Sequence, residues 1–135
     1  CALPIWQEVV VDGAYMAGAD GSVPGLANVE ATAYVRMWNA YREGDWGSVR
    51  TEQDKMAALM RITSVVQGVQ GFGAGVGAFK TALALLGVFD TNQMPNPVAP
   101  LAGENVERIA AVLKDCGLPL ARTPLEVSES TVVKG

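Results

Sequence analysis

The chain has 135 residues, half of them apolar and 18% charged, which suits one soluble domain. The charged fraction is low for a free-standing small domain and fits better a domain that packs against further protein. A net charge of −4 argues against a nucleic-acid partner, because phosphates need clustered Lys and Arg. The chain has no histidine, which excludes His-based triads and His metal sites.

Cysteine content and hydropathy narrow the class of protein further. Two cysteines, Cys1 and Cys116, make neither a disulfide framework nor a metal site. The uncharged stretch between Arg61 and Lys80 contains five glycines, which argues against a membrane span. The start lacks the basic region and apolar core of a secretion signal, so we expect a cytoplasmic protein without a membrane partner.

The first five residues look foreign to the rest. Cys1 to Ile5 are what the end of a widely used sequencing adapter encodes in one frame. We therefore expect residues 1–5 to be a non-native artefact, and the absent initiator methionine favours a truncated gene. The alternative is an ordinary loop, and the nucleotide sequence would decide between the two.

The first elements are a helix and a short strand. Residues 8–19 have helical spacing, and Gly18 is suited to end the helix. Residues 22–27 (Ser22 to Ala27) form the one predicted strand, and Asn28 is a good N-cap for the next helix. A lone strand has nothing to pair with, which indicates a missing piece of protein. The apolar side of the first helix comprises Val9, Val10, Gly13, Met16 and Ala17.

The remaining elements are helices. A stripe of Tyr34, Met37, Trp38 and Tyr41 predicts a helix that ends at Gly44. Asp45 can cap a second helix, antiparallel to the first. A glycine-rich loop at 67–77, a third helix closed by Gly87 and a Pro-rich linker follow. A last helix is closed by Gly117, and residues 119–135 are expected to form a flexible tail without periodicity.

The segment Gly21 to Val29, with sequence GSVPGLANV, resembles the last barrel strand of the dihydrodipicolinate synthase and N-acetylneuraminate lyase family. Segments 44–46, 77–83 and 97–101 resemble later parts of that family in the same order. Its members are (β/α)8 TIM barrels whose lysine forms a Schiff base with pyruvate or a related keto acid, without a cofactor.

The resemblance implies an α/β parent of which this chain is the C-terminal part, mostly α-helical with one short strand. Residues 6–44 would be the last helix-strand-helix unit of the barrel, and residues 45–118 a C-terminal helical appendage.

The resemblance also suggests a substrate-binding segment, Val23, Pro24 and Gly25. In the family, the residue that matches Val23 offers its backbone carbonyl near the bound keto acid. The position that matches Gly25 often carries a small hydroxyl residue that contacts the rest of the substrate. Here Pro24 and Gly25 offer no hydroxyl, and Pro24 has no N–H, which puts the identity of the substrate in question. The alternative is that Pro24 and Gly25 only shape a strand-to-helix turn.

No catalytic residue is expected in this chain. The family's Schiff-base lysine, tyrosine relay and Thr-Thr pair all belong to earlier strands. A nucleophilic lysine needs a desolvated pocket to lose its proton near neutral pH. The lysines here fall on predicted helices or in the tail, not at a strand end: Lys55, Lys80, Lys114 and Lys134.

Two other patterns have simpler interpretations. The glycines before Lys80 and Thr81 suggest a phosphate-binding loop, but Phe79 stands where the motif needs glycine. Asp12, Asp20 and Glu30 suggest a metal site, but Asp20 suits a turn and Glu30 a first helical turn. We expect no metal.

The sequence therefore predicts part of a pyruvate-type Schiff-base lyase or synthase, performing aldol cleavage, condensation or a related dehydration, and inactive alone. The complete enzyme would bind a pyruvate-like keto acid and form a homo-oligomer, a dimer or tetramer. The alternative is a small independent helical protein-interaction domain without catalytic activity.

Overall fold

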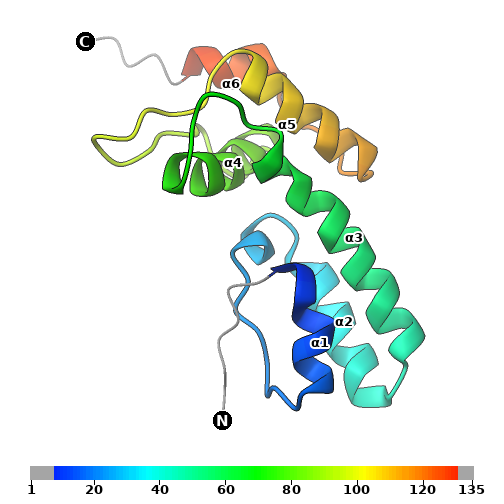
Figure 1. Ribbon diagram of the computed structural model, residues 1–135. Coiled ribbons are helices and arrows are strands. Elements are labelled where there is room, and N and C mark those ends of the chain that lie inside the picture. The colour runs from blue at the N-terminus through cyan, green and yellow to red at the C-terminus, as the bar shows by residue number, and fades with distance from the viewer. Residues whose placement is uncertain (1–7, 131–135) are drawn as a thin grey trace. The chain divides into compact units, whose positions relative to one another are not determined.

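The computed structural model describes residues 8–130, and the regular elements among them are all helices (Figure 1). The proposed artefact at residues 1–5 lies outside the described range. No helix within that range is long and apolar enough to cross a membrane. In chain order the helices are η1 (Glu8–Val10), α1 (Val11–Met16), η2 (Gly25–Asn28), α2 (Ala31–Glu43), α3 (Trp46–Ser64), α4 (Phe72–Leu85), α5 (Glu104–Asp115) and α6 (Pro124–Ser130).

The chain divides into two compact units, one ending at Met60 and the other beginning at Arg61, near the end of α3. In the first unit, Val11 of α1, Leu26 of η2 and Met37 of α2 are fully buried. Most of α3 belongs to this unit. The predicted division at residues 44 and 45 concerns the complete barrel and stays a prediction.

An aromatic cluster links the helices of the first unit. The Tyr15 ring stacks on Tyr41 with ring centroids 5.0 Å apart, and Trp38 meets both rings edge-on or tilted. Trp46, at the start of α3, packs against Tyr41 at 5.6 Å. The predicted stripe on α2 therefore packs inside the unit, as its spacing indicated.

The predicted strand at Ser22–Ala27 is absent from this structure. Residues 21–24 have no regular structure, and Gly25–Asn28 form the 3₁₀ helix η2. The physical reason is that a strand exists only with a partner, and the described residues provide none. Asn28 does not cap α2 either. Its amide donates to the Gly25 carbonyl, while the Glu30 carboxylate accepts from the Ala33 N–H at 3.0 Å and caps α2.

The first helix also differs from its prediction. It is shorter, and the buried side chains are Val11, Ala14 and Tyr15, which lie on another side from the predicted apolar residues. Val9, Val10 and Met16 are exposed, Met16 by 73%. Periodicity identified a helix here but not the side that packs within this chain.

Helices α4, α5 and α6 pack against one another in the second unit (Figure 1). The predicted glycine-rich loop is wrong for residues 72–77, because α4 begins at Phe72. A Cβ atom at Gly77 would lie 3.3 Å from Leu101 Cγ, so glycine lets the linker lie close against this helix. The linker is fixed by Asn92, fully buried, which donates to Thr81 Oγ1 and to the Leu101 carbonyl.

The structure differs from the predicted tail at residues 124–130, which form α6. Its Val127 is fully buried. Thr123 and Glu126 form a reciprocal cap at its start, since Thr123 N–H donates to Glu126 Oε2 at 2.6 Å and Glu126 N–H donates to Thr123 Oγ1 at 3.3 Å. Val127 and this capping box help to hold the short helix against α4 and α5.

Candidate functional site

The segment Val23–Gly25 leads from the irregular residues 21 and 22 into η2, which begins at Gly25. Val23 is 73% exposed, whereas Pro24 is buried with φ −77° and ψ 139°. Gly25 is not among the glycines with a positive φ, so its backbone does not require glycine. The three predicted site residues are contiguous, with one exposed side chain and no side chain at Gly25.

Two hydrogen bonds from side chains hold this segment. The hydroxyls of Tyr15, on α1, and Ser22 share a hydrogen bond of 3.0 Å just before Val23. The Gly25 N–H donates to Glu8 Oε1 at 3.0 Å just after Pro24. We call these two bonds the tethers. Between described residues, the backbone groups of residues 21–23 form no backbone hydrogen bond, so the tethers are the main polar restraints on the segment.

Glu8 lies in a buried polar cluster. It is only 9% exposed, and its backbone carbonyl accepts from Gln53 Nε2 at 2.9 Å. The hydroxyl of Tyr34 is buried and has no hydrogen-bond partner among the described residues. Burial raises the pKa of Tyr34 above its ordinary value, and the charges of Glu8 and then Tyr15 raise it further. The phenol therefore stays neutral next to the carboxylate.

The lysines of the described residues serve structural contacts or lie in solvent. Lys55 Nζ pairs with Glu52 Oε1 at 2.7 Å, and Lys80 Nζ donates to the Gln93 carbonyl at 2.9 Å. Lys114 is exposed near the end of α5, and Lys134 lies outside the described residues. Of the acidic residues considered for a metal, Asp12 accepts from Gly13 N–H at 2.8 Å and Glu30 caps α2.

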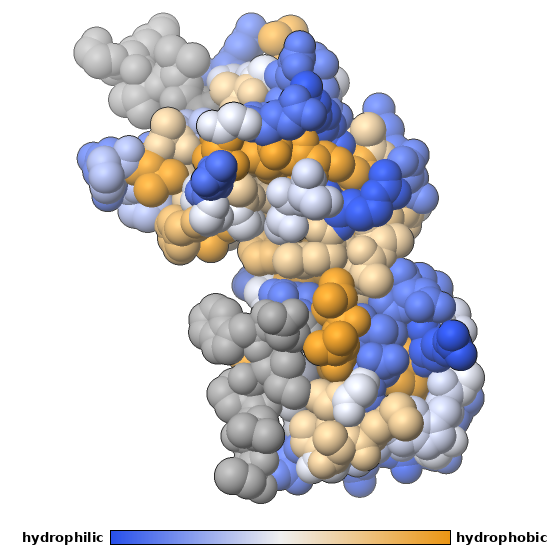
Figure 2. Space-filling model, in the orientation of Figure 1, coloured by the Kyte–Doolittle hydropathy of each residue, from blue (hydrophilic) through white to orange (hydrophobic). Residues whose placement is uncertain are grey.

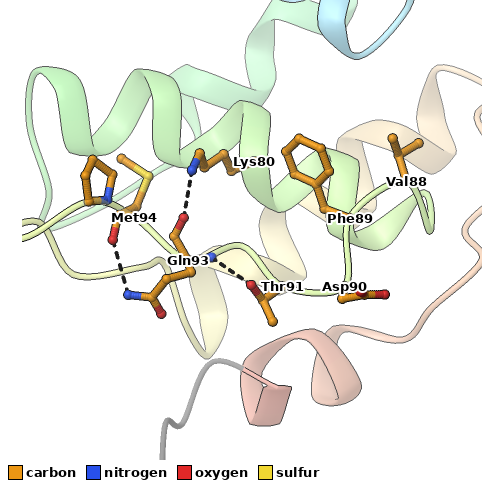
Figure 3. Close-up of a pocket in the computed structure, with 8 residues that line it drawn as sticks. Lys80, Val88, Phe89, Asp90, Thr91, Gln93 and Met94 are labelled. Carbon is orange, nitrogen blue, oxygen red and sulfur yellow. Dashed lines mark hydrogen bonds between the residues drawn. The ribbon is translucent and has the colours of Figure 1, made fainter.

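A second candidate is an open pocket of about 680 Å³ in the second unit, beside Lys80 (Figure 3). Phe89 and Met94 contribute apolar side chains. The Lys80 ammonium points to the Gln93 carbonyl, and the Gln93 side-chain amide donates to the Met94 carbonyl at 3.2 Å (Figure 3). Lys80 therefore fixes the linker, and the pocket has no nucleophile paired with a base.

Sequence reasoning did not identify Glu8, Tyr15 or Tyr34 as part of the site. Tyr34 was assigned to the apolar stripe of α2, and Glu8 only to the start of a helix. The available signal was a tyrosine and a carboxylate on the side of the first helix opposite its most apolar residues. Glu8 and Tyr15 point to a site only once the structure shows that they bond Gly25 and Ser22.

Comparison with known proteins gives consistent matches. The model of the family described as "Dihydrodipicolinate synthetase family" matches residues 6–116. An uncharacterized DapA-like lyase of Thermofilum pendens is 28% identical over 105 residues, which is 78% of this chain and 33% of that protein. The structure of dihydrodipicolinate synthase from Bacteroides thetaiotaomicron matches with a TM-score of 0.75 and 25% identity.

That structural match covers 84% of this chain and 37% of the synthase chain, so the chain spans roughly a third of the length of both relatives. The matched residues include α1, the Val23–Gly25 segment and the helices up to α5. Together the geometry and the family match lead to one conclusion: the chain belongs to the dihydrodipicolinate synthetase family.

Proposed function

We propose that this chain is the C-terminal part of a (β/α)8 barrel lyase or synthase that forms a Schiff base with a pyruvate-like keto acid. The observation that carries the proposal is the family match over residues 6–116 of a chain that spans only a third of its relatives. A complete barrel needs eight strand-helix units, and the described residues provide at most the last one.

In the complete barrel, residues 22–27 would form the last strand by pairing with strands that the described residues 8–130 do not contain. Val23 to Gly25 would then reach the face formed by the C-terminal strand ends, where barrel enzymes build their active sites. The Val23 carbonyl would face the keto acid, and the rest of the substrate would pass over Gly25. The exposure of Val23 supports this arrangement, because it leaves the Val23 end of the segment accessible.

Exposed apolar side chains support a missing body of protein. Val9, Val10, Met16 and Val35 of the first unit are between 44% and 73% exposed. Figure 2 shows apolar residues on the visible face of the molecule beside polar ones. Val9, Met16 and Trp46 line an open pocket of about 470 Å³ within this unit. We propose that the rest of the barrel covers part of this surface. The complete protein would be a homo-oligomer, as a dimer or tetramer.

Trapping with borohydride tests the proposal. The full-length protein should gain one pyruvate-derived mass at a single lysine upstream of this chain, since a Schiff base needs a lysine with a depressed pKa. This chain alone should gain none. Stoichiometric trapping at Lys55, Lys80 or Lys114 would contradict the proposal, as would a full-length protein that is never trapped.

Substitution of Gly25 tests its role in specificity. In the full-length protein, Gly25→Val should raise KM for the longer substrate while trapping of the short keto acid changes little. The effect should be about 1–3 kcal/mol, the range for a few methyl groups in a pocket. Gly75→Val, on α4 with no atom within 4 Å of its added Cβ, is the matched control. Equal loss of trapping and turnover in a folded Gly25→Val protein would remove Gly25 from the specificity site.

A further inference from the structure

The conformation of residues 22–25 depends on side chains that lie outside the segment. A strand is normally fixed by a ladder of backbone hydrogen bonds, and between described residues this segment has none at residues 21–23. The two tethers replace the ladder. One acts before Val23 and the other after Pro24, so they bracket the Val23–Pro24 peptide.

We propose that Glu8 and Tyr15 are positioning residues that fix the direction of the Val23 carbonyl, an inference that rests on the proposed function. Tyr15 acts through the Ser22 hydroxyl, and Glu8 through the N–H of Gly25. Pro24 completes the restraint, because its ring fixes φ between the two anchor points.

The burial of both groups makes the tethers effective. Tyr15 is 3% exposed and Glu8 is 9% exposed, so water competes poorly for either bond. A hydrogen bond from an amide to a carboxylate is stronger than one between neutral groups. The Tyr15 ring also packs against Trp38 and Tyr41 of α2, which restricts the position of the hydroxyl that bonds Ser22.

Four side chains provide variants that separate positioning from folding. Glu8→Ala removes the acceptor, and Glu8→Gln keeps an oxygen in its place. Tyr15→Phe and Ser22→Ala remove the two ends of the same bond. Glu30→Ala is the matched control, because Glu30 also accepts from a backbone N–H at 3.0 Å in the same unit, at the start of α2.

The first measurement is amide hydrogen exchange at Gly25 in the 135-residue chain. We expect faster exchange at Gly25 in Glu8→Ala, protection near that of the original chain in Glu8→Gln, and no change at Gly25 in Glu30→Ala. Unchanged exchange at Gly25 in a folded Glu8→Ala chain would overturn the proposal.

The second measurement is keto-acid trapping and turnover in the full-length protein. Glu8→Ala should lower kcat/KM roughly tenfold to a hundredfold, the scale for a small displacement of a binding group, and Glu8→Gln should restore most of it. Tyr15→Phe and Ser22→Ala should have equal effects that do not add in the double variant, because they break one bond. If Glu8→Ala does not fold, the comparison of Tyr15→Phe, Ser22→Ala and their double variant tests the proposal instead.

The outcomes distinguish the inference from the proposed function. The positioning role would be overturned if Glu8→Ala lowered kcat/KM no more than Glu30→Ala does, or if the effects of Tyr15→Phe and Ser22→Ala were additive. Neither result would affect the proposed function, as long as the wild-type protein is trapped by the keto acid. A wild-type full-length protein that traps no keto acid would overturn the proposed function, and the positioning role with it. Gly25 exchange would then still report whether the hydrogen bond exists.

Discussion

The ion pair between Arg36 of α2 and Glu52 of α3 predicts that loss of Arg36 lowers the free energy of unfolding more than loss of Glu52 does. Glu52 is buried, with a side chain 10% exposed, and both nitrogens Nε and Nη2 of Arg36 donate to its Oε2 at 3.1 and 2.8 Å. Arg36 is 54% exposed and Lys55, the other partner, is 56% exposed. Loss of Arg36 therefore leaves a poorly solvated carboxylate, whereas loss of Glu52 leaves two cations in water.

Arg36→Met should lower the free energy of unfolding by about 1–2 kcal/mol, between the values for exposed and for buried charged hydrogen bonds. Glu52→Met should cost less than about 0.5 kcal/mol, because an apolar side chain of similar size replaces a buried charge. Arg50→Met on α3 is the control, since Arg50 is exposed and makes no ion pair with another described residue.

Urea unfolding followed by tryptophan fluorescence measures these changes. All three tryptophans, Trp6, Trp38 and Trp46, precede Met60, so the signal follows the first unit. Equal losses for Arg36→Met and Glu52→Met, or an Arg36→Met value within about 0.5 kcal/mol of Arg50→Met, would refute the reasoning, because that is the range of ordinary surface substitutions.

The pH dependence provides a check on the same pair. Burial raises the pKa of Glu52, but hydrogen bonds from Arg36 and Lys55 outweigh burial and hold the pKa below its ordinary 4.5. The unfolded state therefore takes up the proton first. The contribution of the pair is present above about pH 4.5 and is lost as the pH falls through the folded-state pKa. The difference between the original chain and Arg36→Met should shrink at acid pH.

Two further predictions concern the isolated chain. It should self-associate on sizing and bind a dye for exposed apolar surface, because side chains such as Met16 and Val23 are exposed. A monomer that binds no dye would instead support an independent domain. Gly87→Ala should be destabilised by about 1–2 kcal/mol, since Gly87 has φ +77° and an added Cβ would lie 2.8 Å from Ala121 Cβ, whereas Gly75→Ala should be neutral or stabilising in circular-dichroism melts.

Local chemistry made several helix ends predictable. Gly44 and Gly117 have φ of 75° and 76°, the left-handed conformation that glycine favours after a helix. Asp45 caps α3 through Ser48, whose N–H donates to Asp45 Oδ1 at 3.1 Å. Thr123 and Glu126 carry the same kind of signal, with Pro124 at the first helical position, and a search for capping boxes would have identified α6.

Features that depend on distant residues were not predictable in this way. Glycine content suggested a loop at residues 72–77, but packing of Leu101 against Gly77 favours a helix there over intrinsic propensity. The packed side of α1 depends on which helices are present, and here those are α2 and α3. The strand at residues 22–27 needs neighbouring strands, and its prediction applies to the complete barrel.

The tethers are local contacts that hold a segment whose strand pairing depends on distant residues. Strand pairing is a property of the whole barrel, yet Ser22 and Gly25 are each held by a residue less than 20 positions earlier in the chain. The shape of the proposed substrate wall is then encoded locally, by η1, α1 and the loop between α1 and η2, before any neighbouring strand arrives. Pairing would add a ladder of backbone hydrogen bonds along residues 22–27, and we expect the Gly25 N–H to keep donating to Glu8. Under the proposed roles, we expect a substitution at Gly25 to change the preferred substrate without displacing the segment, provided that Glu8 and Tyr15 are kept.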